Sequence, residues 1–123
     1  MTDETQLLGI SNAIVDVLAQ VDERFLKEIG APRGSMTLID KDRAHEIYGM
    51  MNATTEMSGG SVANSIAGFA TLGGAAAYIG QVKKDQLGDV FRTDMQSLGV
   101  DIRLLPAADG SPTARCHVLI DAD

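Results

Sequence analysis

The sequence is poor in cysteine, aromatic residues and positive charge. It contains one cysteine, no tryptophan, two tyrosines and three phenylalanines. A single cysteine, Cys116, cannot form a disulfide within the chain, which excludes a disulfide-stabilised scaffold. Ten basic residues stand against seventeen acidic ones, giving a net charge of -7. Because such a chain repels phosphate backbones and anionic lipids, we expect no nucleic-acid partner and no membrane partner.

The sequence also shows no targeting segment. Its first residues, MTDETQ, do not have the basic and apolar regions of a signal peptide, so a cytoplasmic location is expected. Residues 57–82 carry no charge and are long enough for a membrane span. Six glycines and several polar side chains interrupt this stretch, which favours a helix, a turn and a buried strand instead.

The 123 residues fit a single α/β domain. Helices are predicted from Asp22 to Gly30, from Asp40 to about Met51, from about Ser61 to Leu72, and, after a charged loop at 83–86, from residue 87 to Leu98. Strands are predicted at residues 7–21 (as one or two strands), 35–39, 75–82, 100–105 and 113–120, with 52–57 as a polar connection. The alternation of strands and helices predicts a largely parallel sheet, and the strands with mixed faces predict a separate small sheet.

A glycine pair followed by a serine precedes the third predicted helix. Gly59, Gly60 and Ser61 leave the backbone uncovered where a helix presents free N–H groups and a partial positive charge. Asn64 returns to the same helical face one turn later and can both donate and accept hydrogen bonds. This pattern suits a small polyhydroxylated ligand, and it is equally typical of an ordinary glycine-rich start of a helix.

Asp16 stands inside the apolar run Ala13-Ile14-Val15-Asp16-Val17-Leu18. A carboxylate is costly there unless it is hydrogen-bonded or open to a cleft. It could accept hydrogen bonds from two sugar hydroxyls. The alternative is a solvated, outward-facing residue of an alternating strand.

Other chemically versatile residues do not form a known site pattern. His45 and Glu46 lack the second histidine of an HExxH zinc motif, so no metal ligand is assigned. Cys116 and His117 are neighbours in a predicted strand and point to opposite faces, which indicates structural roles. The acidic residues Asp85 and Asp94 are expected to be solvated surface.

Several short motifs together resemble one family. The sequence is similar to the ribokinase-like (PfkB) carbohydrate and nucleoside kinases, most of all to bacterial sugar kinases and adenosine kinases. The motifs that carry this resemblance are Gly59-Gly60-Ser61 with Asn64, Leu72-Gly73-Gly74, Ala77-Tyr78-Ile79-Gly80, Asp85-Gln86-Leu87-Gly88, Leu8-Gly9-Ile10, Asn12-Ala13-Ile14-Val15-Asp16-Val17, Gly99-Val100-Asp101 and Thr113-Ala114-Arg115-Cys116. Ser11 stands where many members have glycine.

The resemblance implies a three-layer core, a parallel sheet flanked by helices, with a small β-sheet lid. Residues 1–123 would be the N-terminal portion of one such domain. The implied lid strands are approximately 14–21, 36–39, 100–105 and 113–120, and the remainder would be core. The sequence does not show whether a homodimer forms through the lid.

The resemblance also implies an activity, namely ATP-dependent phosphorylation of a hydroxymethyl group of a sugar or nucleoside by the full-length protein. In this reading Asp16 and Asn64 hold the hydroxyls of the acceptor, and the backbone at Gly59 and Gly60 assists. No catalytic residue is expected in this segment. The base, and most residues that bind ATP and Mg²⁺, are expected beyond Asp123, so the isolated segment is predicted to be inactive. The alternatives are a non-catalytic small-molecule-binding domain and an inactive fragment.

Overall fold

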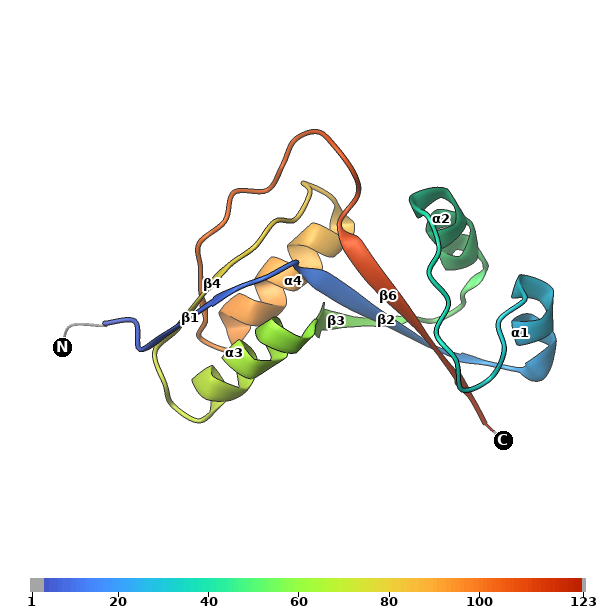
Figure 1. Ribbon diagram of the computed structural model, residues 1–123, viewed down its shortest axis with the longest axis horizontal. Helices are drawn as coiled ribbons and strands as arrows, with labels where there is room; N and C mark the ends of the chain where they lie inside the picture. Colours follow the sequence, from blue (N-terminus) through green and yellow to red (C-terminus); the bar gives the residue numbers. More distant parts are fainter. Residues whose placement is uncertain (1–3, 123) are drawn as a thin grey trace. The chain divides into compact units, whose positions relative to one another are not determined.

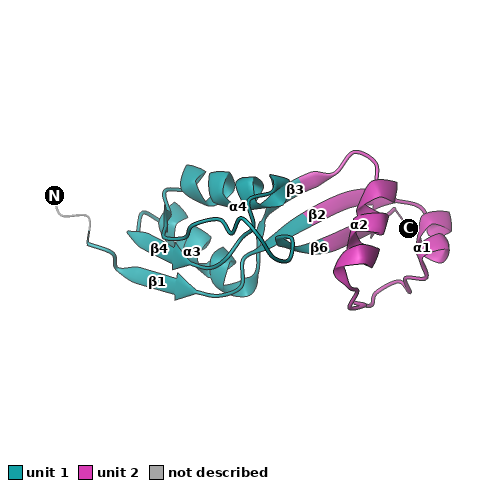
Figure 2. Cartoon of the chain, turned by 90° about the horizontal axis from the view of Figure 1, so that it is seen from above, with its two compact units in different colours: residues 1–16, 56–116 teal, residues 17–55, 117–123 magenta. Residues whose placement is uncertain are grey.

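The computed structural model describes residues 4–122, which form two compact units. Unit 1 comprises the described residues up to Asp16 together with 56–116. Unit 2 comprises 17–55 and the described residues from His117 on (Figure 2).

The elements follow one another in the order shown in Figure 1. The strands are β1 (Leu7–Ile10), β2 (Ile14–Val21), β3 (Thr55–Gly59), β4 (Ala76–Ile79), β5 (Asp101–Ile102) and β6 (Ala114–Asp121). The helices are α1 (Glu23–Ile29), α2 (Lys41–Met50), α3 (Ser61–Thr71) and α4 (Gln86–Ser97).

Unit 1 is built on a parallel sheet with the strand order β1-β4-β5. Leu7 pairs with Ala76 at one end of the β1–β4 ladder and Ile10 pairs with Ile79 at the other. Helix α3 contacts β1 and β4 (Figure 1), and helix α4 contacts β5. Strand β4, helix α4 and strand β5 thus form the predicted unit of two parallel strands joined by a helix, which confirms the α/β class.

The core of unit 1 lies between this sheet and its helices. The rings of Tyr78 and Phe91 are both fully buried, with centroids 5.4 Å apart. Ile66 of α3 packs so closely on β1 that a side chain at Gly9 would place its Cβ 2.5 Å from the Cγ1 of Ile66. Glycine at position 9 therefore allows α3 to pack closely on the sheet.

Strands β3, β2 and β6 form a second three-stranded sheet, in that order. Each of the three strands has residues in both units. In β2, alternate side chains at Val15, Val17 and Ala19 are buried, whereas Asp16 on the other face is half-buried. The alternation places Asp16 away from the buried face.

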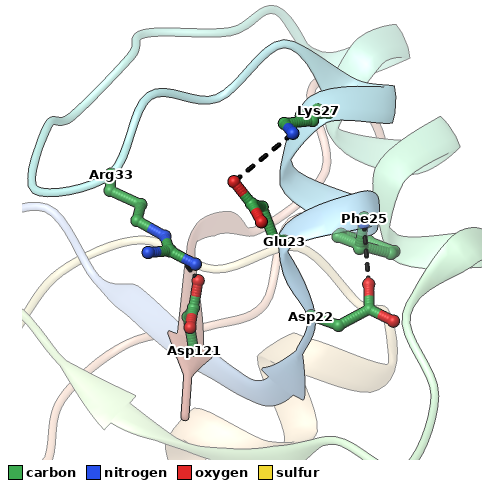
Figure 3. A network of polar contacts seen from close by, with 6 residues as sticks. All are labelled: Asp22, Glu23, Phe25, Lys27, Arg33 and Asp121. Atoms are coloured by element: carbon green, nitrogen blue, oxygen red, sulfur yellow. Dashed lines mark hydrogen bonds and ion pairs between the residues drawn. The ribbon is translucent and has the colours of Figure 1, made fainter. Parts of the chain in front are cut away.

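Unit 2 contains helices α1 and α2. Asp22 caps α1 by accepting a hydrogen bond from the Phe25 N–H (2.8 Å), and Asp40 caps α2 in the same way with Arg43. Figure 3 shows the α1 cap and the ion pair between Arg33 and Asp121, whose Nε and Oδ2 atoms are 2.7 Å apart. This pair joins the turn after α1 to the end of β6.

Three predicted elements require correction. No strand forms at residues 35–39, and Met36 and Leu38 expose 82% and 88% of their surface, because no neighbouring strand pairs with this short run. The expected connection at 52–57 contains the start of β3. The strand predicted at 100–105 is reduced to β5, and it pairs with β4 in the parallel sheet instead of joining the small one. The division of the chain into core and lid stays a prediction.

None of the helices formed by residues 4–122 has the length and apolar character needed to cross a bilayer.

Candidate functional site

The junction between β3 and α3 has the backbone geometry expected for a ligand-approach point. Gly60 precedes α3 with φ 95° and ψ 144°, a conformation that favours glycine. Its carbonyl accepts the N–H of Asn64 at 2.9 Å, which closes the first helical turn. Within the described residues, no side chain caps this helix start, so its partial positive charge is not offset by a capping oxygen.

Gly59 lies directly against the carboxylate of Asp16. A Cβ at this position would lie 2.6 Å from Asp16 Oδ1, and closer still to Oδ2. The missing side chain at Gly59 is thus the space that the Asp16 carboxylate occupies. The two glycines are needed for different reasons. Gly60 has a positive φ, which favours glycine, and Gly59 leaves room for the Asp16 carboxylate.

The structure places all four predicted site residues in unit 1. Asp16 is half-buried on β2, Gly59 is buried at the end of β3, and Asn64 is exposed in the first turn of α3. Asp16 and Gly59 are brought together by packing, and Gly60 and Asn64 are joined by the helical hydrogen bond. Their binding roles stay a prediction.

Two neighbours of these residues were not predicted as site residues. The backbone oxygen of Asn12 lies 3.7 Å from the position that a Cβ at Gly60 would take. Burial raises the pKa of the Cys116 thiol, and the negative charge of Asp16 raises it further, so the two groups interact electrostatically. Recognising from the sequence that β6 neighbours β2 would have identified Cys116; Asn12 was noted only as part of a motif.

A groove of about 390 Å³ adjoins this region. It lies just beyond the carboxyl ends of β1 and β4, where open parallel sheets commonly bind ligands. Its lining residues are Asn12–Ile14, Gln81–Lys83, Ala107, Asp109 and Ser111–Ala114. Asn12 and Ile14 belong both to the groove and to the surroundings of Gly60, so the groove continues from the candidate site.

Asp94 is not the solvated surface residue that the sequence indicated. Its Oδ2 accepts hydrogen bonds from both the backbone N–H and the hydroxyl of Ser58, each at 2.7 Å. Ser58 immediately precedes Gly59, so this carboxylate of α4 fixes the end of β3. A second groove of about 940 Å³ runs along α4 and includes Asp94 in its lining.

The Ser11 side chain is held by Tyr78. The Ser11 Oγ and Tyr78 hydroxyl oxygens are 2.8 Å apart, and the Tyr78 hydroxyl donates to the Ser11 carbonyl at 3.1 Å. Burial raises the pKa of Tyr78, although the Ser11 hydrogen bond opposes this, so the phenol stays protonated at neutral pH. A side chain at Gly80 would collide with the Tyr78 ring. The pair holds the turn that carries Asn12.

Residues 4–122 do not bring three acidic, histidine or cysteine side chains close enough together to hold a metal ion.

The known proteins that this chain resembles include adenosine kinases and a probable sugar kinase. "Adenosine kinase 2" of Arabidopsis thaliana is 28% identical over 120 residues, which cover 93% of this chain and 34% of that protein. The crystal structure of adenosine kinase from Sinorhizobium meliloti superposes with a TM-score of 0.82 at 44% identity and covers 97% of this chain and 36% of that one. A probable sugar kinase from Rhizobium etli CFN 42 gives a TM-score of 0.79 at 41% identity, over 100% of this chain and 37% of that one.

This chain spans about a third of the length of these relatives. Their similarity extends over the strands and helices that hold Asp16, Gly59, Gly60 and Asn64. Residues 34–123 also match the family described as pfkB family carbohydrate kinase. The chain therefore belongs to the pfkB family of carbohydrate kinases.

Proposed function

We propose that the protein uses ATP to phosphorylate a hydroxymethyl group of a nucleoside or sugar, and that this chain supplies the acceptor-binding residues. The observation that carries the proposal is the Asp16 carboxylate, which lies in the space left by Gly59 beside the uncapped start of α3. The printed names of the relatives, adenosine kinase and probable sugar kinase, support the acceptor class.

The chemistry of these groups suits a polyhydroxylated acceptor. A carboxylate can accept hydrogen bonds from two neighbouring hydroxyls, and each such charge-assisted bond contributes about 1.5–3 kcal/mol. The Asn64 amide both donates and accepts, and the backbone at Gly60 has no side chain in front of it. Asp16 would fix the acceptor through its hydroxyls while Asn64 sets its orientation.

ATP and Mg²⁺ are implied by the family. When bound, they supply the transferred phosphoryl group and neutralise its charge. The part that we propose for this chain is binding and orienting the acceptor.

The test is an Asp16→Ala substitution in the protein expressed from its complete coding frame. Loss of two charge-assisted bonds predicts that affinity for the acceptor falls by at least about a hundredfold. Calorimetry with adenosine, ribose and fructose measures this, and ATP turnover is followed in parallel. Asp89→Ala is the matched control, because Asp89 is an exposed residue of α4 outside the candidate site.

Two results would count against the proposal. Unchanged acceptor affinity in folded Asp16→Ala protein would remove Asp16 from the site. Acceptor binding without any phosphoryl transfer in the wild-type protein would instead favour a non-catalytic binding domain.

A further inference from the structure

Thr113, the residue before β6, is held by a partly buried polar cluster in unit 1. Only 3% of its surface is exposed. Its N–H donates to Asp85 Oδ2 at 2.9 Å and its hydroxyl donates to Asp85 Oδ1 at 2.6 Å. The same hydroxyl oxygen accepts the N–H of Lys83 at 3.0 Å. We call Lys83, Asp85, Gly88 and Thr113 the clasp.

Helix capping alone does not account for the clasp. Asp22 and Asp40 each cap a helix with one hydrogen bond from the third helical residue. Asp85 makes the same bond to Gly88, at 2.8 Å, and additionally holds both the N–H and the hydroxyl of Thr113. The additional bonds attach the chain segment before β6 to the start of α4.

Gly88 permits this close packing. A Cβ at position 88 would collide with the carbonyl of Lys83 and lie 3.2 Å from the Thr113 hydroxyl oxygen. Burial alone would raise the pKa of Asp85, but the bonds from Thr113 and Gly88 and the nearby charge of Arg115 outweigh it and lower that pKa. The carboxylate is thus charged and fully engaged at neutral pH.

The clasp also fixes one wall of the groove beside the candidate site. At the other end of this wall, the Ala107 N–H donates to the Val82 carbonyl (2.9 Å) and the Ala107 carbonyl accepts from the Lys84 N–H (2.8 Å). Residues 107–113 are therefore attached at both ends, and several of them line the groove together with Asn12 and Ile14. Cys116, three residues after Thr113, interacts electrostatically with Asp16, whose negative charge raises the pKa of the thiol.

We propose that Asp85 and Thr113 are positioning residues for acceptor binding, because the clasp sets the start of β6 and the groove wall beside Asp16. The inference rests on the proposed function. Asp85 and Thr113 act through the segment that they hold and are not assigned a contact with the acceptor.

The first test is Thr113→Val in the protein expressed from its complete coding frame. Valine keeps the volume but removes the hydroxyl, so the KM for adenosine or sugar should rise about tenfold while kcat and the KM for ATP change less than about twofold. Thr113→Ser restores the hydroxyl and should recover most of the affinity. The matched control is Thr71→Val, because the Thr71 hydroxyl bonds only to Ala67 within α3, at 2.8 Å.

A second test follows the position of β6 without any acceptor. Alkylation of Cys116 is measured by peptide-resolved mass spectrometry at neutral pH. Movement of β6 away from Asp16 removes a charge that disfavours the thiolate, so Thr113→Val should be alkylated several-fold faster than wild type. If Thr113→Val does not fold, Asp85→Asn takes its place, since it disrupts the same bonds at nearly the same volume.

The outcomes separate the two proposals. Unchanged KM for the acceptor together with unchanged Cys116 alkylation would overturn the positioning role. If the wild-type protein neither binds nor phosphorylates any acceptor, the proposed function fails, and the alkylation rates still decide whether the clasp positions β6.

Discussion

Unit 1 and unit 2 bury side chains of different size. Among residues 4–122, the largest fully buried side chains are Tyr78, Phe91, Ile66, Met95, Val15, Val17 and Val82, and all except Val17 belong to unit 1. The helices of unit 2 contribute only Leu26, Ala44 and Ile47. Because stability scales with apolar surface removed from water, unit 1 is the better stabilised unit, and the candidate site lies on it.

The polar contacts of the two units also differ. In unit 1, Asp85 and Asp94 each hold a distant backbone segment with several hydrogen bonds. In unit 2, the Lys27–Glu23 pair joins side chains that are 75% and 60% exposed, and pairs of this kind contribute little (Figure 3). Asp85 and Asp94 thus hold the segments around the site, whereas in unit 2 the Lys27–Glu23 pair acts within one helix and the Arg33–Asp121 pair joins the turn after α1 to β6.

The largest effect should come from emptying the core of unit 1. Phe91→Ala removes a fully buried ring that packs on Tyr78 and should lower the free energy of unfolding by about 3–5 kcal/mol. Leu26→Ala, in the smaller core of unit 2, should cost about 2 kcal/mol, the low end for such changes. Urea denaturation of both variants measures the difference in the free energy of unfolding. Equal losses would contradict the conclusion that unit 1 is the better stabilised unit.

A smaller effect is expected when the space beside Asp16 is filled. Gly59→Ala places a methyl group where the Asp16 carboxylate lies and should weaken acceptor binding by about 1.5–3 kcal/mol, the value of one charge-assisted bond. Gly68→Ala is the matched control, since nothing lies within 4 Å of the added Cβ in the middle of α3. That control should stabilise the protein by about 0.5–1 kcal/mol and leave affinity unchanged. Calorimetric titration with adenosine measures the affinity of both variants. Unchanged affinity in Gly59→Ala would show that the Asp16 carboxylate can move without weakening acceptor binding.

The smallest effect should come from the ion pair of unit 2. Arg33→Gln removes the charge that contacts Asp121, but the Arg33 side chain is 47% exposed. We expect a loss of about 0.2–1 kcal/mol in the free energy of unfolding, and less at high salt. Thermal unfolding at two salt concentrations measures it. A loss above about 2 kcal/mol would mean that unit 2 depends on polar contacts more than the comparison allows.

The sequence predicted the elements that carry their own local signals. The helices after Asp22 and Asp40 begin where the predicted capping residues precede helical runs, and the buried strand at β4 was also expected. The prediction failed for segments whose structure depends on a neighbouring strand. Residues 35–39 have strand-like composition but no strand beside them, and β5 has too few residues for its pattern to say which sheet it joins.

The same limit applies to the candidate site. Gly60 and Asn64 could be linked by helical spacing, whereas the fit of Asp16 against Gly59 depends on how β2 and β3 pack. Asp85 and Asp94 were expected at the solvated surface because their partners lie 28 and 36 residues away in the chain. A local pattern contains no information on such contacts.

The boundary between the units crosses the chain at 16/17, 55/56 and 116/117, in each case inside a strand of the β3-β2-β6 sheet. For protein engineering, this means that unit 2 cannot be exchanged for that of a relative by a single splice. A chimera needs three junctions, each joined in the correct strand register. An error of one residue at 16/17 would turn every following side chain of β2 to the opposite face. The Val17 side chain would then lie on the face of β2 that carries Asp16 and not on the buried face. Recombination between relatives should therefore succeed only when the strand lengths on both sides of all three junctions are kept.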